Sequence, residues 1–316
     1  MKTNKQKLFK RFLKALAIIF IIMNVIAIFH AYKFTHFSTE AQDKVIADKL
    51  TPAQKARVLF FGVNNPRPIN TKKPSGPYET VTLQSNKKIE CWIIKVKNAK
   101  GTVVLFHGYQ GDKSKLIGES DTFTALGYNT MLVDFMGSGG SEGNQTTIGF
   151  KEAEQVKTCF DYISKTEKSI YLCGNSMGAV AILKAVADYG VKPKAIIIGC
   201  PFGTMYNTVC ARFDIMGVPK FPMAGLLMFW GGTTNGFWAF GHNPDEYAKA
   251  VKCPVLLCYG QKDNRVSRAE IDTIYANLNG KKTLKVYADA GHDFLEDSKN
   301  TWPGDIALFL NKINSL

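Results

Sequence analysis

The chain has 316 residues, of which 46% are hydrophobic and 21% charged; this balance excludes a disordered chain and allows one large core. Its formal net charge of +14 raises the question of a nucleic-acid partner. Six positive charges, however, fall within the first fourteen residues, and the other lysines are scattered as on a solvated surface. No zinc-finger spacing or aromatic–basic RNA motif accompanies them. We therefore predict no nucleic acid among the partners.

An apolar run follows this basic start. Between residues 13 and 32 the strongly polar positions are Lys14, Asn24 and His30, and about 20 apolar residues suffice to span a bilayer. The run predicts one transmembrane helix within residues 1–37, acting as an uncleaved signal anchor. A cleaved signal peptide, followed by secretion, is the alternative. No small-x-small cleavage site follows the run, which favours the anchor.

The orientation of this single-pass chain follows from its charges. Positive residues tend to stay in the cytoplasm, so we predict a cytoplasmic N-terminus and an extracytoplasmic main domain. The seven cysteines show no short regular spacing, which argues against a disulfide framework and a zinc site. Free thiols are more typical of the cytosol, and burial of most of them would remove this conflict.

Residues 38–77 divide into two parts. The first, up to residue 62, has a helical composition with a break or restart at Pro52 and Thr51 as its N-cap. The second contains four prolines in fourteen residues, which indicates a linker or a long surface loop. The globular domain is expected over residues 78–316.

In this domain short apolar runs alternate with helical stretches. The first two runs suggest an antiparallel hairpin, and the next six are nearly continuous in hydrophobicity, as strands covered on both faces require. The pattern predicts an α/β fold with an eight-stranded, mostly parallel sheet flanked by helices. Residues 201–250 interrupt the alternation between the sixth and seventh strands and predict an inserted cap. The predicted strands are residues 78–84, 89–96, 101–108, 129–135, 169–174, 194–200, 254–260 and 284–289, and the helices 113–126, 150–165, 177–189, 268–278 and 302–313.

Two segments match the pattern G-x-S-x-G of a nucleophilic serine, residues 139–143 and residues 174–178. A nucleophile of this kind needs a sharp turn between a strand and a helix, where the next backbone N–H faces the developing oxyanion. Residues 174–178 directly follow a predicted strand and directly precede a helical run. Residues 139–143 do neither. We therefore predict that Ser176 is the nucleophile.

A serine needs a general base, and the base needs an anionic partner. Among the five histidines, His292 lies in a short loop after the last predicted strand, at the sheet edge that carries Ser176. Asp263 lies in the loop after the preceding strand. Asp134 is better explained as a cap of the glycine-rich turn, and Asp289 lies too near the histidine in sequence. The predicted triad is therefore Ser176, Asp263 and His292.

An oxyanion needs two backbone N–H donors. Met177, directly after the predicted nucleophile, supplies one. For the other we predict Tyr109, in the loop that follows the third strand. His107 in the same loop is expected to support the loop rather than donate a proton. No metal or organic cofactor is required for such a site.

The segments LFHGYQG, DFMGSGGSEG, GNSMG, CPVLLCYGQKD and AGHDF resemble, in order and spacing, the α/β-hydrolase superfamily of serine hydrolases. The likeness covers roughly residues 78–316 and is greatest to membrane-anchored bacterial esterases and lipase-like enzymes, although Met136 stands where an arginine is common in that group. The resemblance implies an α/β-hydrolase fold and acyl-transfer chemistry. It does not imply a particular substrate. A serine nucleophile argues against haloalkane and epoxide chemistry, which needs a carboxylate.

The predicted cap is rich in apolar and aromatic residues. It is either a small packed subdomain or an apolar pocket for an acyl or alcohol group. The second interpretation predicts a small-molecule or lipid-like substrate: a carboxylic ester or thioester with an apolar arm, cleaved through an acyl-enzyme. The residues predicted to bind that arm are Phe221, Leu227, Phe229, Trp230, Phe237 and Trp238.

Two alternatives stay open. The same triad would serve an acyltransferase that passes the acyl group to an acceptor other than water. A membrane-tethered binding protein could also have kept the fold and lost the chemistry, but the sequence retains a candidate for every member of the triad.

Overall fold

The predicted α/β architecture is confirmed in the computed structural model, which describes residues 4–40, 51–293 and 301–315. One eight-stranded sheet has the order β1-β2-β4-β3-β5-β6-β7-β8. β2 is antiparallel to both β1 and β4, and every other pairing is parallel. The strands are β1 Glu79–Gln84, β2 Lys88–Ile94, β3 Thr102–Phe106, β4 Asn129–Val133, β5 Ile170–Asn175, β6 Ala195–Gly199, β7 Val255–Gly260 and β8 Lys282–Tyr287.

Helices cover both faces of the sheet, because right-handed crossovers that run in opposite directions along the sheet place their helices on opposite sides. The crossover from β3 to β4 carries α3, and those from β4 to β5 and from β5 to β6 carry α4 and α5. The helices predicted in this domain are all present. Their bounds are α3 Ile117–Ala125, preceded by the 3-10 turn η2 Lys113–Leu116, α4 Glu152–Ser164, α5 Met177–Tyr189, α9 Arg268–Asn277 and α11 Trp302–Asn314.

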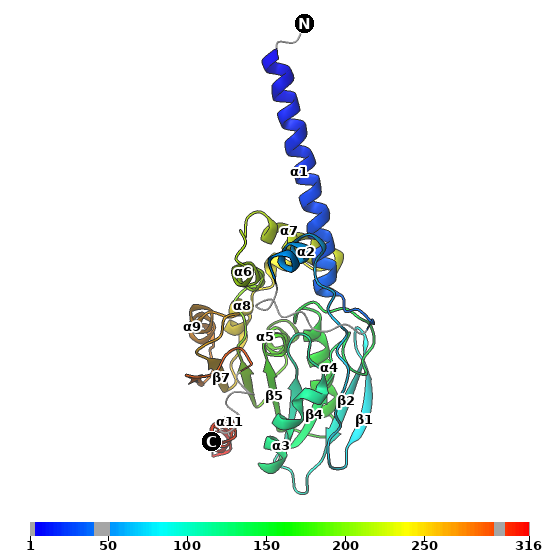
Figure 1. Cartoon of the computed structure of the whole chain (residues 1–316). Coiled ribbons are helices and arrows are strands. Elements are labelled where there is room, and N and C mark those ends of the chain that lie inside the picture. Colours follow the sequence, from blue (N-terminus) through cyan, green and yellow to red (C-terminus); the bar gives the residue numbers. More distant parts are fainter. Residues whose placement is uncertain (1–3, 41–50, 294–300, 316) are drawn as a thin grey trace.

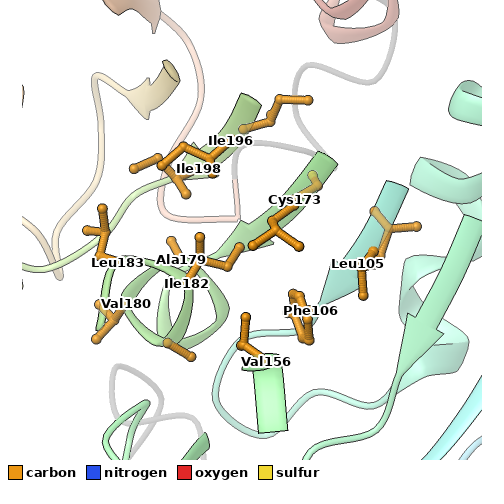
Figure 2. Packing of buried hydrophobic residues seen from close by; sticks show 14 of the residues in the cluster. Leu105, Phe106, Val156, Cys173, Ala179, Val180, Ile182, Leu183, Ile196 and Ile198 are labelled. Atoms are coloured by element: carbon orange, nitrogen blue, oxygen red, sulfur yellow. The ribbon is translucent and has the colours of Figure 1, made fainter. Parts of the chain in front are cut away.

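The core lies between the central strands and these helices. Strands β3, β6 and β7 are buried along their whole length, which explains their unbroken apolar sequences. Figure 2 shows part of this core, in which α5 lies beside β5 and β6. All seven cysteines are free, and all but Cys253 are buried, so six of the seven thiols are shielded from the surroundings.

Helix α1 (Asn4–Thr35) projects away from the domain (Figure 1) and is longer than the predicted span. It is long and apolar enough to cross a membrane. Most of its large apolar side chains are exposed, whereas Ala27, Ala31 and Thr35 near its end are buried. There α1 contacts the cap helix α7 (Met223–Thr234). The helix is thus one continuous rod whose last turns belong to the folded domain.

The segment between α1 and the sheet lies against the domain. Helix α2 (Pro52–Phe61) begins, as predicted, after the N-cap Thr51, which forms a capping box with Gln54. The rest of the predicted helix falls on residues 38–40, which are not helical because Ser38 pairs with Pro66, and on residues 41–50, which lie outside the described residues.

The proline-rich stretch is irregular, as its composition predicts, yet it is attached to the domain. The Arg67 guanidinium donates to the carbonyl oxygens of Gly139, Ser141 and Gly143 at 2.9, 2.6 and 3.2 Å. Asn65 donates to the hydroxyl of Tyr109 at 3.1 Å. This stretch therefore braces two loops at the edge of the sheet.

The predicted cap is inserted between β6 and β7. Its helix α7 lies beside α1, and the Trp230 indole donates to the Asn24 side-chain oxygen of α1 at 2.9 Å. Asn235 donates to the Thr35 hydroxyl at 3.1 Å. The cap thus supplies partners for two polar side chains of the apolar helix. Its elements are α6 Met205–Met216, α7, η3 Ala239–Gly241, α8 Pro244–Tyr247 and η4 Ala248–Ala250.

Candidate active site

Ser176 occupies a strained turn between β5 and α5. Its φ of 51° and ψ of −115° lie outside the regions that side-chain-bearing residues favour, and its N–H donates to the Gly199 carbonyl at 2.8 Å. A side chain at Gly174 would collide with the backbone of Gly178, and one at Gly178 with the carbonyl of Phe106. The two glycines of the motif are therefore required sterically, and the turn exposes the serine hydroxyl at the carboxyl edge of the sheet.

The three residues predicted as a triad lie within hydrogen-bonding distance of one another. Nε2 of His292 is 2.9 Å from Oγ of Ser176, and Nδ1 of His292 is 2.7 Å from Oδ2 of Asp263. They come from the ends of β5, β7 and β8. Since the carboxyl ends of parallel strands share one edge, residues far apart in sequence meet there. The arrangement allows a proton to pass from the hydroxyl to the imidazole.

Asp263 is held in place by its own loop. Its Oδ1 accepts hydrogen bonds from the backbone N–H groups of Arg265 and Val266 at 2.8 and 3.0 Å. Burial opposes its charge, but the hydrogen bond from His292, the charge of that imidazole when protonated, and these two N–H groups together lower the pKa of Asp263 below its ordinary value. The carboxylate is thus fixed and ionised, as a partner for an imidazolium must be.

The two residues predicted to donate to an oxyanion border the same site. Met177 is the first residue of α5, so its N–H has no acceptor within the helix. Tyr109 lies in the loop after β3 and lines the cavity that contains Ser176. Its side chain points elsewhere: the hydroxyl donates to the Phe34 carbonyl at 2.7 Å, and the ring stacks on the Phe34 ring at 4.9 Å. The loop is thereby tied to the end of α1.

The second G-x-S-x-G motif, residues 139–143, has a structural role. The buried Ser141 hydroxyl donates to the Asp134 carbonyl at 2.7 Å and accepts from the Glu90 N–H at 2.8 Å. The side chain of Asp134 accepts from Gly140 N–H at 2.8 Å, so it caps the glycine-rich turn. Asp289 is exposed and pairs with Lys262 at 2.9 Å. None of these residues contacts Ser176.

His107 supports the loop that carries Tyr109. Its Nε2 accepts from the Phe135 N–H at 3.1 Å, and its Nδ1 therefore donates to the Gly108 carbonyl at 2.8 Å. Burial lowers its pKa, which keeps the ring neutral and able to make both bonds. The histidine joins the loops after β3 and β4, and both of its ring nitrogens bond to backbone groups rather than to Ser176.

Cys200 lies close to two triad residues, and its thiol, with Asp263 and His292, forms a group of donor atoms within 4.8 Å of one another. Burial raises the pKa of this thiol well above its ordinary value, so it is poorly suited to bind a metal as a thiolate. Both imidazole nitrogens of the histidine already have partners. The chemistry of the donor set therefore fits a triad beside a buried thiol better than a metal site.

One cavity contains part of the triad, and a second cavity adjoins the first. The first, of about 960 Å³, contains Ser176 and His292. The second, of about 330 Å³, lies between the end of α1, α6 and α7, and its lining is mostly apolar. The residues that line both cavities are Tyr109, Gln110, Arg212 and Ile215.

The six cap residues predicted to bind substrate are distributed differently. None of them lines the cavity of Ser176; Leu227 and Phe237 line the second cavity. Phe221 and Trp238 are 88% and 60% exposed, Phe229 is 43% exposed, and Trp230 bonds to α1. The cap residues that do line the cavity of Ser176 are Arg212 and Ile215, and these were not predicted from the sequence. The reason is that aromatic content alone does not tell which face of a short helix points inward.

His242 joins the cap to the α/β domain. It is fully buried, with Nε2 3.0 Å from the Ile148 carbonyl and Nδ1 3.2 Å from the Tyr247 hydroxyl. Burial lowers its pKa from 6.5 to about 4, and the nearby charge of Lys184 acts in the same direction. The structure therefore holds this histidine neutral in a place where a charge cannot be solvated.

Acid should destabilise the protein through this residue. Between pH 6.5 and 4 the unfolded chain binds a proton at His242 that the folded chain does not, so the free energy of unfolding falls as the pH falls, by about 3 kcal/mol. Above that window the residue is neutral in both states and contributes no slope. Urea unfolding over this pH range should show a smaller slope in His242→Gln. An equal slope would contradict the assignment; Asp263 cannot produce it, since its contribution is lost only below pH about 4.

The chain is similar to several known proteins, among them a lipase and an esterase. A family model described as serine aminopeptidase, S33, matches residues 97–224. The chain is 25% identical over 220 residues to uncharacterized protein YqkD of Bacillus subtilis, covering 67% of this chain and 72% of that one. It is 23% identical over 249 residues to the lysophosphatidylserine lipase ABHD12 of Gallus gallus, covering 68% of this chain and 64%, less than two thirds, of the lipase. The Pyrococcus furiosus esterase Pf2001 superposes with a TM-score of 0.65 at 23% identity, covering 79% of this chain and 97% of the esterase.

Proposed function

This chain has the α/β-hydrolase fold, and from that premise we propose that it is a serine hydrolase that cleaves a carboxylic ester or thioester with an apolar arm. The observation that carries the proposal is the continuous chain of hydrogen bonds from Ser176 through His292 to Asp263. A serine with an adjacent base, and a base with a fixed anionic partner, is the arrangement that activates a hydroxyl as a nucleophile.

In the proposed reaction the Oγ of Ser176 attacks the carbonyl carbon while Nε2 of His292 takes its proton. The ionised Asp263 stabilises the imidazolium that forms. The N–H groups of Tyr109 and Met177 donate to the oxyanion of the tetrahedral intermediate. The imidazolium then gives its proton to the leaving alcohol or thiol, and an acyl-enzyme remains. Water, deprotonated by the same imidazole, attacks the acyl carbon, and a second tetrahedral intermediate releases the acid and restores the serine.

The apolar arm has a place beside the site. The second cavity shares a wall with the cavity of Ser176 and is lined mostly by apolar side chains of α1, α6 and α7. Leu227 and Phe237, predicted to bind the arm, line it. The similarity to a lysophosphatidylserine lipase and to an esterase supports a substrate of this kind.

We propose that α1 anchors the enzyme in a membrane, with the N-terminus in the cytoplasm and the catalytic domain outside it. The exposed apolar surface of α1 supports insertion, and the basic residues at its start support this orientation. Phe229 and Trp230 on α7 lie beside α1, where aromatic side chains are favoured at a membrane interface. Burial of α1's last turns against the cap favours an anchor over a cleaved signal peptide.

The first test is covalent labelling of the full-length protein in membranes with a tagged fluorophosphonate, which reacts with activated serines. We expect labelling that an ester substrate competes away. No labelling of the folded protein would contradict the proposal and would favour a catalytically silent, membrane-tethered binding protein. Product analysis with added alcohols then separates hydrolysis, which yields free acid, from acyl transfer, which yields a new ester.

A further inference from the structure

Arg212 is a cation placed between the two cavities. It belongs to α6 and is half-buried, and its guanidinium lies 5.6 Å from the centre of the Phe34 ring of α1. Within the described residues no carboxylate forms an ion pair with it, whereas Arg268 is paired with Asp272 at 2.8 Å. Keeping a partly desolvated guanidinium without a carboxylate is costly for a protein. Its position suggests that the missing anion comes with the ligand.

None of the other charged residues that the structure describes in the lining of the catalytic cavity forms an ion pair with Arg212. Arg265 also lines the cavity, but it has Asp293 3.9 Å away. Lys115 donates to the Gln110 carbonyl at 3.0 Å. Lys72 and Glu119 line the first cavity but not the second. Among the described residues, Arg212 is the one charged side chain that lines both the serine's cavity and the apolar cavity.

Resting on the function proposed above, we propose that Arg212 binds an anionic group of the substrate, a phosphate or a carboxylate. The planar guanidinium presents paired N–H donors that match either oxyanion. The scissile carbonyl then lies at Ser176 in the first cavity, and the apolar chain occupies the second. The substrate is thus a single-chain amphiphile whose anionic group lies close to its ester. Neutral esters of equal chain length are the poorer substrates.

The test compares two pairs of substrates with one acyl chain. In the first pair lysophosphatidic acid carries a phosphate and monoacylglycerol is neutral; in the second an O-acyl glycolate carries a carboxylate and its amide is neutral. The measured quantity is the ratio of kcat/KM for the anionic member to kcat/KM for the neutral member. The pair with the larger ratio in the unaltered protein identifies the anion as phosphate or carboxylate.

In Arg212→Gln we expect this ratio to fall about 10- to 100-fold, the range for one lost hydrogen-bonded charge pair. Arg212→Lys should keep part of the ratio, because it keeps the charge without the fork of donors. Arg268→Gln, with the same change of charge on the surface, should leave it unchanged.

Three results would overturn the inference. An unaltered protein that prefers the neutral esters would do so, as would an Arg212→Gln ratio equal to that of the unaltered protein. A loss of both activities in equal proportion, with fluorophosphonate labelling retained, would mean that the arginine only supports the fold. Failure of the proposed function itself looks different, since then the unaltered protein would be neither labelled nor active on any of the four esters.

Discussion

Replacing Ser176 with alanine is expected to lower kcat for ester hydrolysis by about 10,000- to 1,000,000-fold, the range for loss of a triad nucleophile. Alanine offers no nucleophile, while the cavity and the backbone donors remain. KM should therefore change little. The measurement is hydrolysis of a short p-nitrophenyl ester by the full-length protein in detergent, with circular dichroism to verify folding.

Ser141→Ala is the matched control, since it alters the second G-x-S-x-G motif. It removes two buried hydrogen bonds, to the Asp134 carbonyl and from the Glu90 N–H, and should lower stability while leaving the Ser176 hydroxyl activated. Fluorophosphonate labelling should be lost in Ser176→Ala and kept in Ser141→Ala. The reverse pattern, or activity retained in Ser176→Ala, would show that another residue is the nucleophile.

Replacing Asp134 with alanine is expected to lower the free energy of unfolding by about 3–5 kcal/mol, because it leaves a buried ammonium without its main partner. Lys113 is fully buried, pairs with Asp134, and lies 2.7 Å from Glu90 and 4.4 Å from the centre of the Trp92 ring. Although burial opposes the charge of Asp134, the ammonium holds its carboxyl pKa below the ordinary value. Chemical unfolding in detergent, followed by tryptophan fluorescence, measures the loss.

A surface pair provides the comparison. Glu246 and Lys249 are exposed and 2.7 Å apart, and Glu246→Ala should cost less than about 1 kcal/mol. Asp134→Asn should lie between the two variants, because it keeps hydrogen-bonding capacity but loses the charge. Equal stability of Asp134→Ala and the unaltered protein would show that the buried pair contributes nothing. Catalysis should survive in whatever fraction remains folded, since Asp134 does not contact Ser176.

The sequence predicts the sheet and the candidate triad for one physical reason. Strands buried on both faces must be apolar throughout, so β3 to β7 stand out, and the alternation with helices makes them parallel. Parallel strands bring the loops after them to one edge. A serine at a tight turn, an aspartate after β7 and a histidine after β8 are therefore predicted to meet, without knowledge of any distance.

The side-chain contacts of the cap and of the N-terminal segments could not be predicted by the same reasoning. In a short helix at a crowded junction, apolar residues can face a cavity, α1 or solvent, and Phe221 at 88% exposed faces solvent. Arg212 lies in α6, and no motif in the sequence of this helix marks it as a ligand-binding residue. Residues 1–77 resemble an anchor and a linker in composition, but composition cannot reveal that Tyr109 would bond to Phe34, or Arg67 to the glycine-rich turn.

Helix α1 forms part of the lining of the second cavity, and this has a kinetic consequence. His30, Ala31 and Phe34 of this helix line a space that adjoins the serine's cavity. With α1 in a bilayer, an amphiphilic substrate would approach by lateral diffusion along the same leaflet, and its search would be two-dimensional. Turnover would then follow the mole fraction of substrate among the lipids rather than its concentration in bulk solution, and diluting the membrane with inert lipid would slow the enzyme at constant total substrate.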